Sequence, residues 1–337
     1  MHYIIRIPQI ALLLCVVKCV PAAEVLLDNG DRLTGTVINL EGNTLRFQTD
    51  YAGVLKIDWN RVARLTTEQD VIVLTDDDQV LQGRVSGSPK AGIQIITDDG
   101  EVIEQMPPDV AMINPEDWRI GRAVNWSGKL NVSVKADRGN ADKDEIDFDT
   151  IVALRRKDDR FEFRADLEYD TSFDEETKQK WDMRGNYDYF VSEKLYYAAN
   201  AALEHDKFKG LKLRYHLGPA VGYQFFEQTD RNLRAEVGAY YTSSDIDDKG
   251  RNNSLATGWL VDFDYRFDSS VFQTYHWQSM ILSSPENMNF KSRTGLRVPL
   301  GGDFLGSAEV EANWDAETAA DSDKTEIIYR LKVGYGW

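Results

Sequence analysis

The residues that could do chemistry in this sequence are charged side chains placed at every second position near its C-terminal end. Three segments in succession carry basic, acidic and again basic residues: Arg293 and Arg297, Glu309 and Glu311, and Arg330 and Lys332. Residues two apart lie on the same face of a strand, and opposite charges on neighbouring strands pair across a sheet. The pattern therefore predicts ion pairing and, where such a face is enclosed, selection among dissolved ions.

Long alternating strands must position these charges. The last segment, KTEIIYRLKVGYGW, places aromatic and aliphatic residues on one face from Tyr329 to Trp337. About twelve such segments follow one another from residue 126 onward. Tight turns, KDDR, VSEK, EQTD, FDSS and LGGD, alternate with longer and mostly acidic connections, DRGNADKDE, TSFDEETKQ, EHDKFKG, SSDIDDKGRN, SSPENMN and DAETAADSD. An even number of strands with short turns on one side and long loops on the other predicts a transmembrane antiparallel β-barrel over residues 126–337.

A soluble β-sandwich would show the same alternation, because it buries one face of each strand and solvates the other. Three features favour the membrane barrel. The segments exceed the usual length of about 5–6 residues for soluble strands. The connections between them alternate between short turns and long loops. Aromatic residues also lie near the segment ends, where interfacial girdles form: Trp126, Tyr169, Trp181, Tyr189, Trp259, Phe267, Trp314 and Trp337.

If the apolar face contacts lipid, the charged face lines a lumen. The predicted lumen residues are Lys129, Arg164, Arg184, Arg214, Arg293, Arg297, Glu309, Glu311, Arg330 and Lys332. Positive and negative charges nearly balance on this face, and two interpretations stay open. The first is a narrow channel for small solutes with weak charge selectivity. The second is a lumen occluded by paired side chains, in a protein with a structural or adhesive role in the cell envelope.

An outer-membrane hydrolase is a third hypothesis. His276 lies close in sequence to Ser279 and Ser283, as a base and a nucleophile would. The stretch HWQSM contains no nucleophile motif and no orienting acid. The acidic run from Asp76 to Asp78 does not have the ligand spacing of a calcium loop. The sequence therefore predicts no enzyme, no catalytic residue, no metal and no cofactor.

The N-terminal residues 1–23 have the features of a secretory signal peptide, with a basic Arg6, an apolar run and a small-residue cleavage site. Both cysteines, Cys15 and Cys19, lie inside this segment, so the exported chain is expected to contain no disulfide. The formal net charge of −17 excludes a nucleic-acid partner, which requires clustered Lys and Arg.

Between the signal peptide and the barrel the sequence repeats itself. VLLDNGDRLTGTV (25–37) matches VLTDDDQVLQGRV (73–85) at an offset of 48 residues. Such self-similarity indicates two copies of one structural unit. Each copy holds about five short alternating runs separated by turn residues. The sequence therefore predicts two small β modules, 24–70 and 71–115, which loosely resemble SH3-like or Sm-like barrels, followed by a linker at 116–125.

The barrel region resembles a known family. It opens on WSGKLNVS (126–133), continues with RGN (138–140) and ends on Trp337. In these features it is similar to domain-of-unknown-function family 481, whose members are described as salt-induced outer-membrane proteins. The resemblance implies an outer-membrane location and a salt-stress or osmotic-stress role, and it brings no catalytic residues.

Location and partners follow from these expectations. The barrel is expected to contact outer-membrane lipid and lipopolysaccharide. Its terminal aromatic residue resembles the signal that barrels present to the assembly machinery. The repeats are expected to lie in the periplasm, where they would contact another envelope protein or peptidoglycan.

Overall fold

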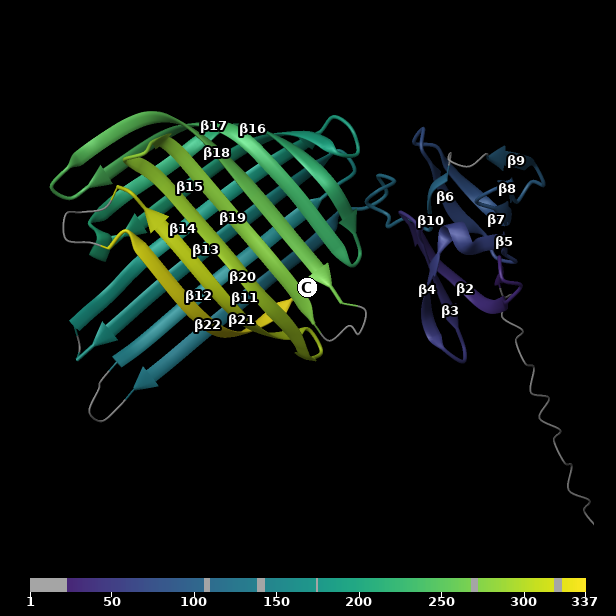
Figure 1. Ribbon diagram of the computed structural model, residues 1–337, viewed down its shortest axis with the longest axis horizontal. Helices are drawn as coiled ribbons and strands as arrows, with labels where there is room; N and C mark the ends of the chain where they lie inside the picture. The colour runs from purple at the N-terminus through teal and green to yellow at the C-terminus, as the bar shows by residue number, and fades with distance from the viewer. Residues whose placement is uncertain (1–22, 106–109, 138–142, 174, 268–271, 318–322) are drawn as a thin grey trace, which may run out of the picture. The chain divides into compact units, whose positions relative to one another are not determined.

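The computed structural model describes residues 23–105, 110–137, 143–173, 175–267, 272–317 and 323–337. The predicted signal peptide, except for its last residue, lies outside the described residues together with both cysteines. The chain divides into two compact units, Met1–Pro115 and Glu116–Trp337. Within the described residues, no helix is long and apolar enough to cross a membrane. Both units are built from β-strands (Figure 1).

The N-terminal unit contains ten strands, five from each repeat. They are β1 (Ala23–Leu27), β2 (Arg32–Glu41), β3 (Thr44–Thr49), β4 (Gly53–Asp58) and β5 (Val62–Thr66) in the first repeat, and β6 (Val71–Thr75), β7 (Val80–Ser88), β8 (Gly92–Ile96), β9 (Val102–Gln105) and β10 (Val110–Ile113) in the second. Each strand of the first repeat has its counterpart in the second, as the offset of the repeat predicts.

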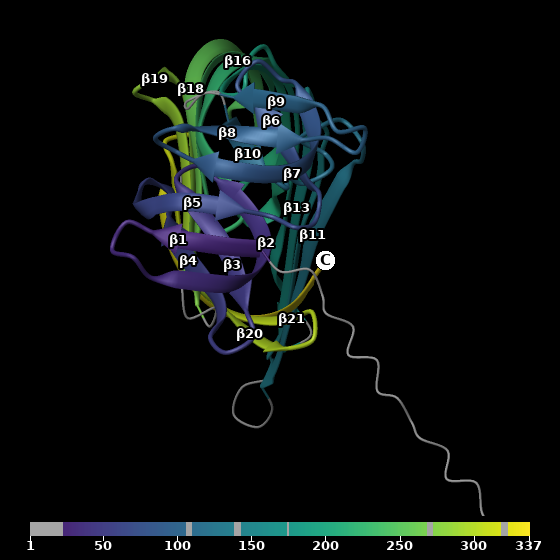
Figure 2. The ribbon, with the colours of Figure 1, turned by 90° about the vertical axis from the view of Figure 1, so that its right-hand side faces the viewer.

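The two repeats exchange strands. The pairing order β1-β5-β7-β6-β10-β2 returns to β1, so six strands form a closed ring. Two contacts join the repeats, β5 with β7 and β10 with β2. Strands β3 and β4 continue from β2, and β8 and β9 continue from β7; Figure 2 shows the run from β1 through β5, β7 and β8 to β9.

One hydrophobic core serves both repeats. Val25, Leu40 and Phe47 of the first repeat belong to the same buried cluster as Val73 and Ile95 of the second. The expected boundary between residues 70 and 71 therefore does not separate two modules. The physical reason lies in β5 and β10, which would each leave one edge unpaired in an isolated repeat, and each finds its missing neighbour in the other copy.

Equivalent glycines mark this unit. Gly35 and Gly83 are related by the repeat offset, and a Cβ atom at either position would lie 1.9 Å from the carbonyl oxygen of Gln48 or 2.4 Å from that of Ile96. Such contacts are far below van der Waals distance. The absence of a side chain therefore lets β3 and β8 cross closely over β2 and β7.

The second unit is a closed antiparallel barrel of twelve strands. They are β11 (Asn125–Asp137), β12 (Lys143–Arg155), β13 (Asp159–Ser172), β14 (Glu175–Phe190), β15 (Leu195–Asp206), β16 (Leu211–Gln228), β17 (Arg231–Ile246), β18 (Gly250–Arg266), β19 (Gln273–Ser284), β20 (Asn287–Gly301), β21 (Phe304–Asp315) and β22 (Thr325–Gly336). Each strand pairs with its sequence neighbours, and β22 returns to β11.

The end of the chain closes the barrel. Lys129 to Val132 of β11 pair with Gly336 to Val333 of β22. Beyond this ladder, Trp337 exchanges two backbone hydrogen bonds with Gly128, at 3.0 and 3.1 Å. A Cβ atom at Gly128 would lie 2.2 Å from the indole of Trp337, so the glycine makes room for this ring. The terminal aromatic residue thus extends the short seam through which β22 and β11 close the ring of twelve strands (Figure 1).

The two faces of the barrel are reversed relative to a soluble protein. Leu331 is 80% exposed and Leu255 is 79% exposed on the outside, whereas Arg234 and Glu236 are each 1% exposed. Lys, Glu, Arg and Asp are almost never fully buried in soluble proteins unless they are paired. The apolar residues therefore form the exterior and the charged residues form the interior.

The two ends of the barrel differ in their connections. The predicted tight turns KDDR, VSEK, EQTD and LGGD lie at the end that also contains Asn125 and Trp337, which we call the turn end, and FDSS falls largely outside the described residues. At the opposite loop end, the strands extend further than the sequence indicates. The stretch TSFDEETKQ, expected to be a loop, belongs largely to β13 and β14. The predicted loops DRGNADKDE (137–145) and DAETAADSD (315–323) lie largely outside the described residues, which exclude 138–142 and 318–322.

Candidate functional site in the lumen

The interior of the barrel is filled by ion pairs. All ten predicted lumen residues occupy inward positions of their strands, as the alternation of exposed and buried residues shows. The charged pairs between the three C-terminal segments are present. Arg293 contacts Glu311 at 3.0 Å, and Lys332 contacts Glu309 at 2.9 Å. Arg330 contacts Glu311 at 2.5 Å.

Further ion pairs connect strands that are not neighbours. Lys291 of β20 lies 2.9 Å from Asp182 of β14 and 2.8 Å from Glu204 of β15. Strands β14 and β20 are six positions apart in the closed order of twelve, so they are on opposite walls. The Lys291 side chain therefore reaches across the lumen, and its ammonium group forms ion pairs with the opposite wall.

The same arrangement recurs at other levels of the barrel. The pairs that join non-adjacent strands are Arg164 with Asp262 (2.9 Å), Arg293 with Asp166 (2.8 Å), Arg214 with Asp315 (2.5 Å), Arg330 with Glu168 (2.7 Å) and Arg234 with Glu162 (2.9 Å). Each joins strands that are three to five positions apart in the ring. An open water-filled bore would keep these groups apart, so their contact shows that side chains narrow the lumen at these levels.

The remaining predicted residues have different surroundings. Arg297 pairs with Asp264 at 3.0 Å and lies 3.7 Å over the Tyr275 ring. Arg184 binds Asp182 on its own strand at 2.9 Å. Lys129 is half-buried and interacts electrostatically with Asp264, without an ion pair among the described residues.

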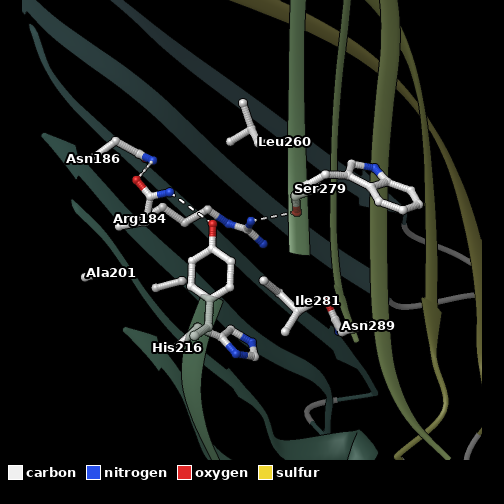
Figure 3. Close-up of a pocket in the computed structure, with 12 residues that line it drawn as sticks. Arg184, Asn186, Ala201, His216, Leu260, Ser279, Ile281 and Asn289 are labelled. Atoms are coloured by element: carbon white, nitrogen blue, oxygen red, sulfur yellow. Dashed lines mark hydrogen bonds between the residues drawn. The ribbon is translucent and has the colours of Figure 1, made fainter. Parts of the chain in front are cut away.

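A small polar cavity lies in the lumen, lined by Arg184 and by neutral residues (Figure 3). Its volume is about 50 Å³, which is room for only a few water molecules. Asn186 donates to Asn200 at 2.7 Å, and Asn200 donates to the Tyr240 hydroxyl at 3.1 Å. Arg184, which also lines the cavity, donates a hydrogen bond to the Ser279 hydroxyl across the lumen at 2.9 Å. Donors and acceptors thus surround a space that fits water or a dehydrated small ion.

These neutral residues are not among the ten predicted lumen residues. Asn186 and Asn200 share the inward parity of Arg184 and Glu204 on their strands, so alternation alone could have identified them, whereas the strand of Ser279 contains no Asp, Glu, Lys or Arg. His216 also lines this cavity, and its Nδ1 lies 3.0 Å from the Thr242 hydroxyl. The ten predicted lumen residues are all charged, so the prediction left out the neutral residues that line the lumen.

The segment that follows the N-terminal unit packs against the turn end of the barrel. Trp118 is buried, and the guanidinium groups of Arg119 and Arg155 lie 4.4 and 4.6 Å from its ring. The Arg155 guanidinium also lies 3.9 Å over Phe190 and pairs with Glu227 at 3.1 Å. Residues 116–122, expected to be part of a linker, thus form a cap that is stacked on lumen side chains by cation–π contacts.

The residues of the hydrolase hypothesis do not converge. His276 occupies an outward position of β19 and lies 2.7 Å from the Thr294 hydroxyl, whereas Ser279 occupies an inward position and accepts from Arg184. Ser283 donates to the backbone of Asn287 at 3.3 Å. The imidazole and the Ser279 hydroxyl are therefore on opposite faces of one strand. Within the described residues, no cluster of His, Cys, Asp and Glu could hold a metal ion.

The N-terminal unit offers a smaller feature. A cavity of about 50 Å³ is lined by Thr36, Thr67 and Asp70 among others. A hydrogen bond to Asp98 raises the pKa of the Asp70 carboxyl, with smaller contributions from burial and from the charge of Asp98. Both carboxyls lie at the surface, and their arrangement indicates no ligand.

Residues 130–337 match the protein family DUF481, described as proteins of unknown function. This match covers more than half of the chain. The chain belongs to the DUF481 family. No curated protein matches this DUF481 chain.

Solved barrels also resemble the chain at low identity. The KdgM porin is 10% identical, over 63% of this chain and 98% of the porin, with a TM-score of 0.35. The NanC porin is 11% identical, over 62% and 98%, with a TM-score of 0.40. An outer membrane channel from Pseudomonas putida F1 is 12% identical, over 66% and 98%, with a TM-score of 0.38. Because these TM-scores are low, the barrel is assigned from the strand pairing of this chain and not from these similarities.

Proposed function

We propose that this DUF481 protein is an outer-membrane β-barrel of Gram-negative type, and that its lumen is a narrow, ion-paired passage for small ions. The exterior supports the membrane placement, because exposed aliphatic residues cover it and aromatic residues such as Trp126 and Trp337 lie at strand ends. A closed sheet has no unpaired edge, which hydrocarbon requires.

The topology supports a periplasmic position for the N-terminal unit. Strand β11 begins at the turn end, so the chain enters the barrel there. In outer-membrane barrels the short turns are periplasmic and the longer loops are extracellular. The repeats would therefore precede the barrel on the periplasmic side, where an envelope protein or peptidoglycan is available as a partner.

The observation that carries the functional proposal is the contact of Lys291 with carboxylates on the opposite wall. Long charged side chains that meet in the middle of the lumen exclude solutes the size of a sugar. They leave polar gaps, such as the cavity beside Asn200 and Ser279, that accept water or an ion. Because both signs line the passage, we expect only weak selectivity between cations and anions.

Conductance measurements test this proposal. The purified protein would be inserted into planar bilayers, alone and as Lys291→Ala, with Lys212→Ala as a matched control. Lys212 also pairs with an aspartate, at 2.8 Å, but both side chains are more than half exposed. We expect small unitary currents in the natural protein, larger currents in Lys291→Ala and no change in Lys212→Ala.

Two outcomes would contradict the proposal. Large currents that ignore the lumen variant would mean that the ion pairs do not close the passage. No current in either protein would favour the alternative function, a structural or adhesive envelope protein with a permanently occluded lumen. That alternative is supported by the same ion pairs, which is why conductance of the Lys291 variant is the deciding measurement.

A further inference from the structure

The outer face of the barrel contains an apolar groove across strands β16 to β19. Its volume is about 740 Å³, far more than the roughly 50 Å³ of the lumen cavity. Its lining includes Leu217, Pro219, Ala239, Leu255 and Leu282. The lumen does not account for this groove, because these side chains occupy outward positions of their strands.

The groove arises from a row of small side chains between two rows of large ones. Its floor consists of Pro219, Ala239 and Thr257, the last two paired directly. On the loop side, three paired residues form a wall: Leu217, Tyr241 and Leu255. On the turn side, a second paired row consists of Val221, Val237 and Trp259. The small residues therefore form the floor of the groove, which runs across the strands as a trench between the two rows of large residues.

Two glycines also lie next to the floor residues on β17 and β18. Gly238 and Gly258 pair with each other on β17 and β18. A Cβ atom at Gly238 would lie 2.7 Å from the Tyr240 hydroxyl, and one at Gly258 would lie 3.1 Å from the Tyr240 ring. Tyr240 covers these glycines from inside and is the residue that lines both the groove and the lumen cavity.

One end of the trench is polar. The last pair between β18 and β19 is Thr257 with Leu282, although β18 begins seven residues earlier, at Gly250. Beyond this pair, β19 ends with Ser283 and Ser284, and Pro285 follows. The trench is therefore apolar along its floor and carries hydroxyl groups where it opens toward the loop end.

We propose that this groove binds one acyl chain of a membrane lipid, with the polar part of the lipid at Ser283 and Ser284. The inference rests on the membrane placement proposed above, which puts the trench against hydrocarbon. A flexible chain fills a narrow trench and buries the exposed Leu217 and Leu255, which are 60% and 79% exposed. A second barrel presents a convex wall, which would bridge the trench and leave its floor empty.

Photolabelling tests the site. The full chain would be reconstituted in phosphatidylethanolamine and phosphatidylglycerol vesicles that contain a trace of phosphatidylethanolamine with a diazirine in one acyl chain. Ala239→Trp fills the trench from β17, and Thr257→Leu narrows it from β18. Ala308→Trp on β21 is the matched control, since Ala308 is also an exposed outward alanine. Heat-modifiable migration on gels would show that each variant is folded.

We expect labels concentrated at Leu217, Leu255 and Leu282. Ala239→Trp should reduce them by about tenfold, the effect of about 1.4 kcal/mol, whereas Ala308→Trp should leave them unchanged. Labels spread evenly around the exterior, labels unaffected by both trench variants, or cross-links between two copies of the chain would overturn the acyl-chain site and leave the membrane placement intact. No labelling anywhere on the exterior would overturn the membrane placement together with the site.

Discussion

Replacing Lys291 with methionine removes the ammonium group that joins opposite walls of the barrel and keeps a side chain of similar length. Lys291 is 5% exposed, and its two partners, Asp182 and Glu204, are 5% and 8% exposed. Removal of one partner from a buried ion pair typically costs about 3–5 kcal/mol, because the other charge stays buried. Asp182 keeps Arg184 at 2.9 Å, and Glu204 keeps Arg214 at 3.5 Å.

Because each carboxylate retains one cation, we expect the lower end of that range, about 3 kcal/mol. This corresponds to more than a hundredfold change in the folding equilibrium. Urea titration of the barrel in lipid vesicles would measure the free energy of unfolding, followed by gel migration and fluorescence. The control is Lys212→Met, whose pair with Asp247 has nearly the same length but is exposed, and it should show no measurable loss.

A double-mutant cycle separates the interaction energy of the Lys291–Glu204 pair from the effects of each substitution on other neighbours. Glu204→Gln would be measured alone and together with Lys291→Met, and the coupling energy should reach about 1–3 kcal/mol. A coupling near zero, or equal losses for Lys291→Met and Lys212→Met, would refute the reasoning. Either result would mean that the two walls are not held together by this contact.

Three further predictions concern the cap and the N-terminal unit. Trp118→Ala should raise the conductance by removing the ring between Arg119 and Arg155, whereas Trp118→Phe should keep most of the stacking; equal currents in both variants and the natural protein would contradict a cap. Gly35→Ala and Gly83→Ala should each destabilise the N-terminal unit by about 1–3 kcal/mol in thermal melts of residues 23–115, and unchanged melting would refute the close approach. A fragment of residues 23–70 should lack the cooperative melting of residues 23–115, since β5 would lose its partner β7.

Much of the barrel could be predicted because its signal is local. The alternation that places Arg330 and Lys332 opposite Leu331 follows from the two-residue period of a strand, whatever the rest of the chain does. The pairs between consecutive segments, such as Arg293 with Glu311, also follow from the order of the strands. The same period placed Trp337 at the end of a strand, where the structure finds the closing seam.

The contacts across the lumen could not be predicted in this way. Arg330 meets Glu168, which is 162 residues away, because the ring is narrow enough for non-adjacent walls to touch. Alternation gives the side of a strand on which a residue lies but not the separation of opposite walls. The union of the two repeats was missed for a related reason: the pairing of β5 with β7 depends on how two copies close on each other, and each copy taken alone looks complete.

The crossing ion pairs have a consequence that distinguishes a filled lumen from a water-filled one. A ring of twelve strands encloses more space than short apolar side chains fill, and here the long charged side chains do the packing that aliphatic residues do in a soluble core. Lys291 then has two effects at once, because it stabilises the fold and blocks the passage. Across a series of variants at lumen positions such as Arg164, Arg293 and Arg330, the loss of stability and the gain in conductance should rise together. In a water-filled pore, variants at these positions would change selectivity without a parallel loss of stability, so independent variation of the two quantities would show that the side chains do not hold the walls together.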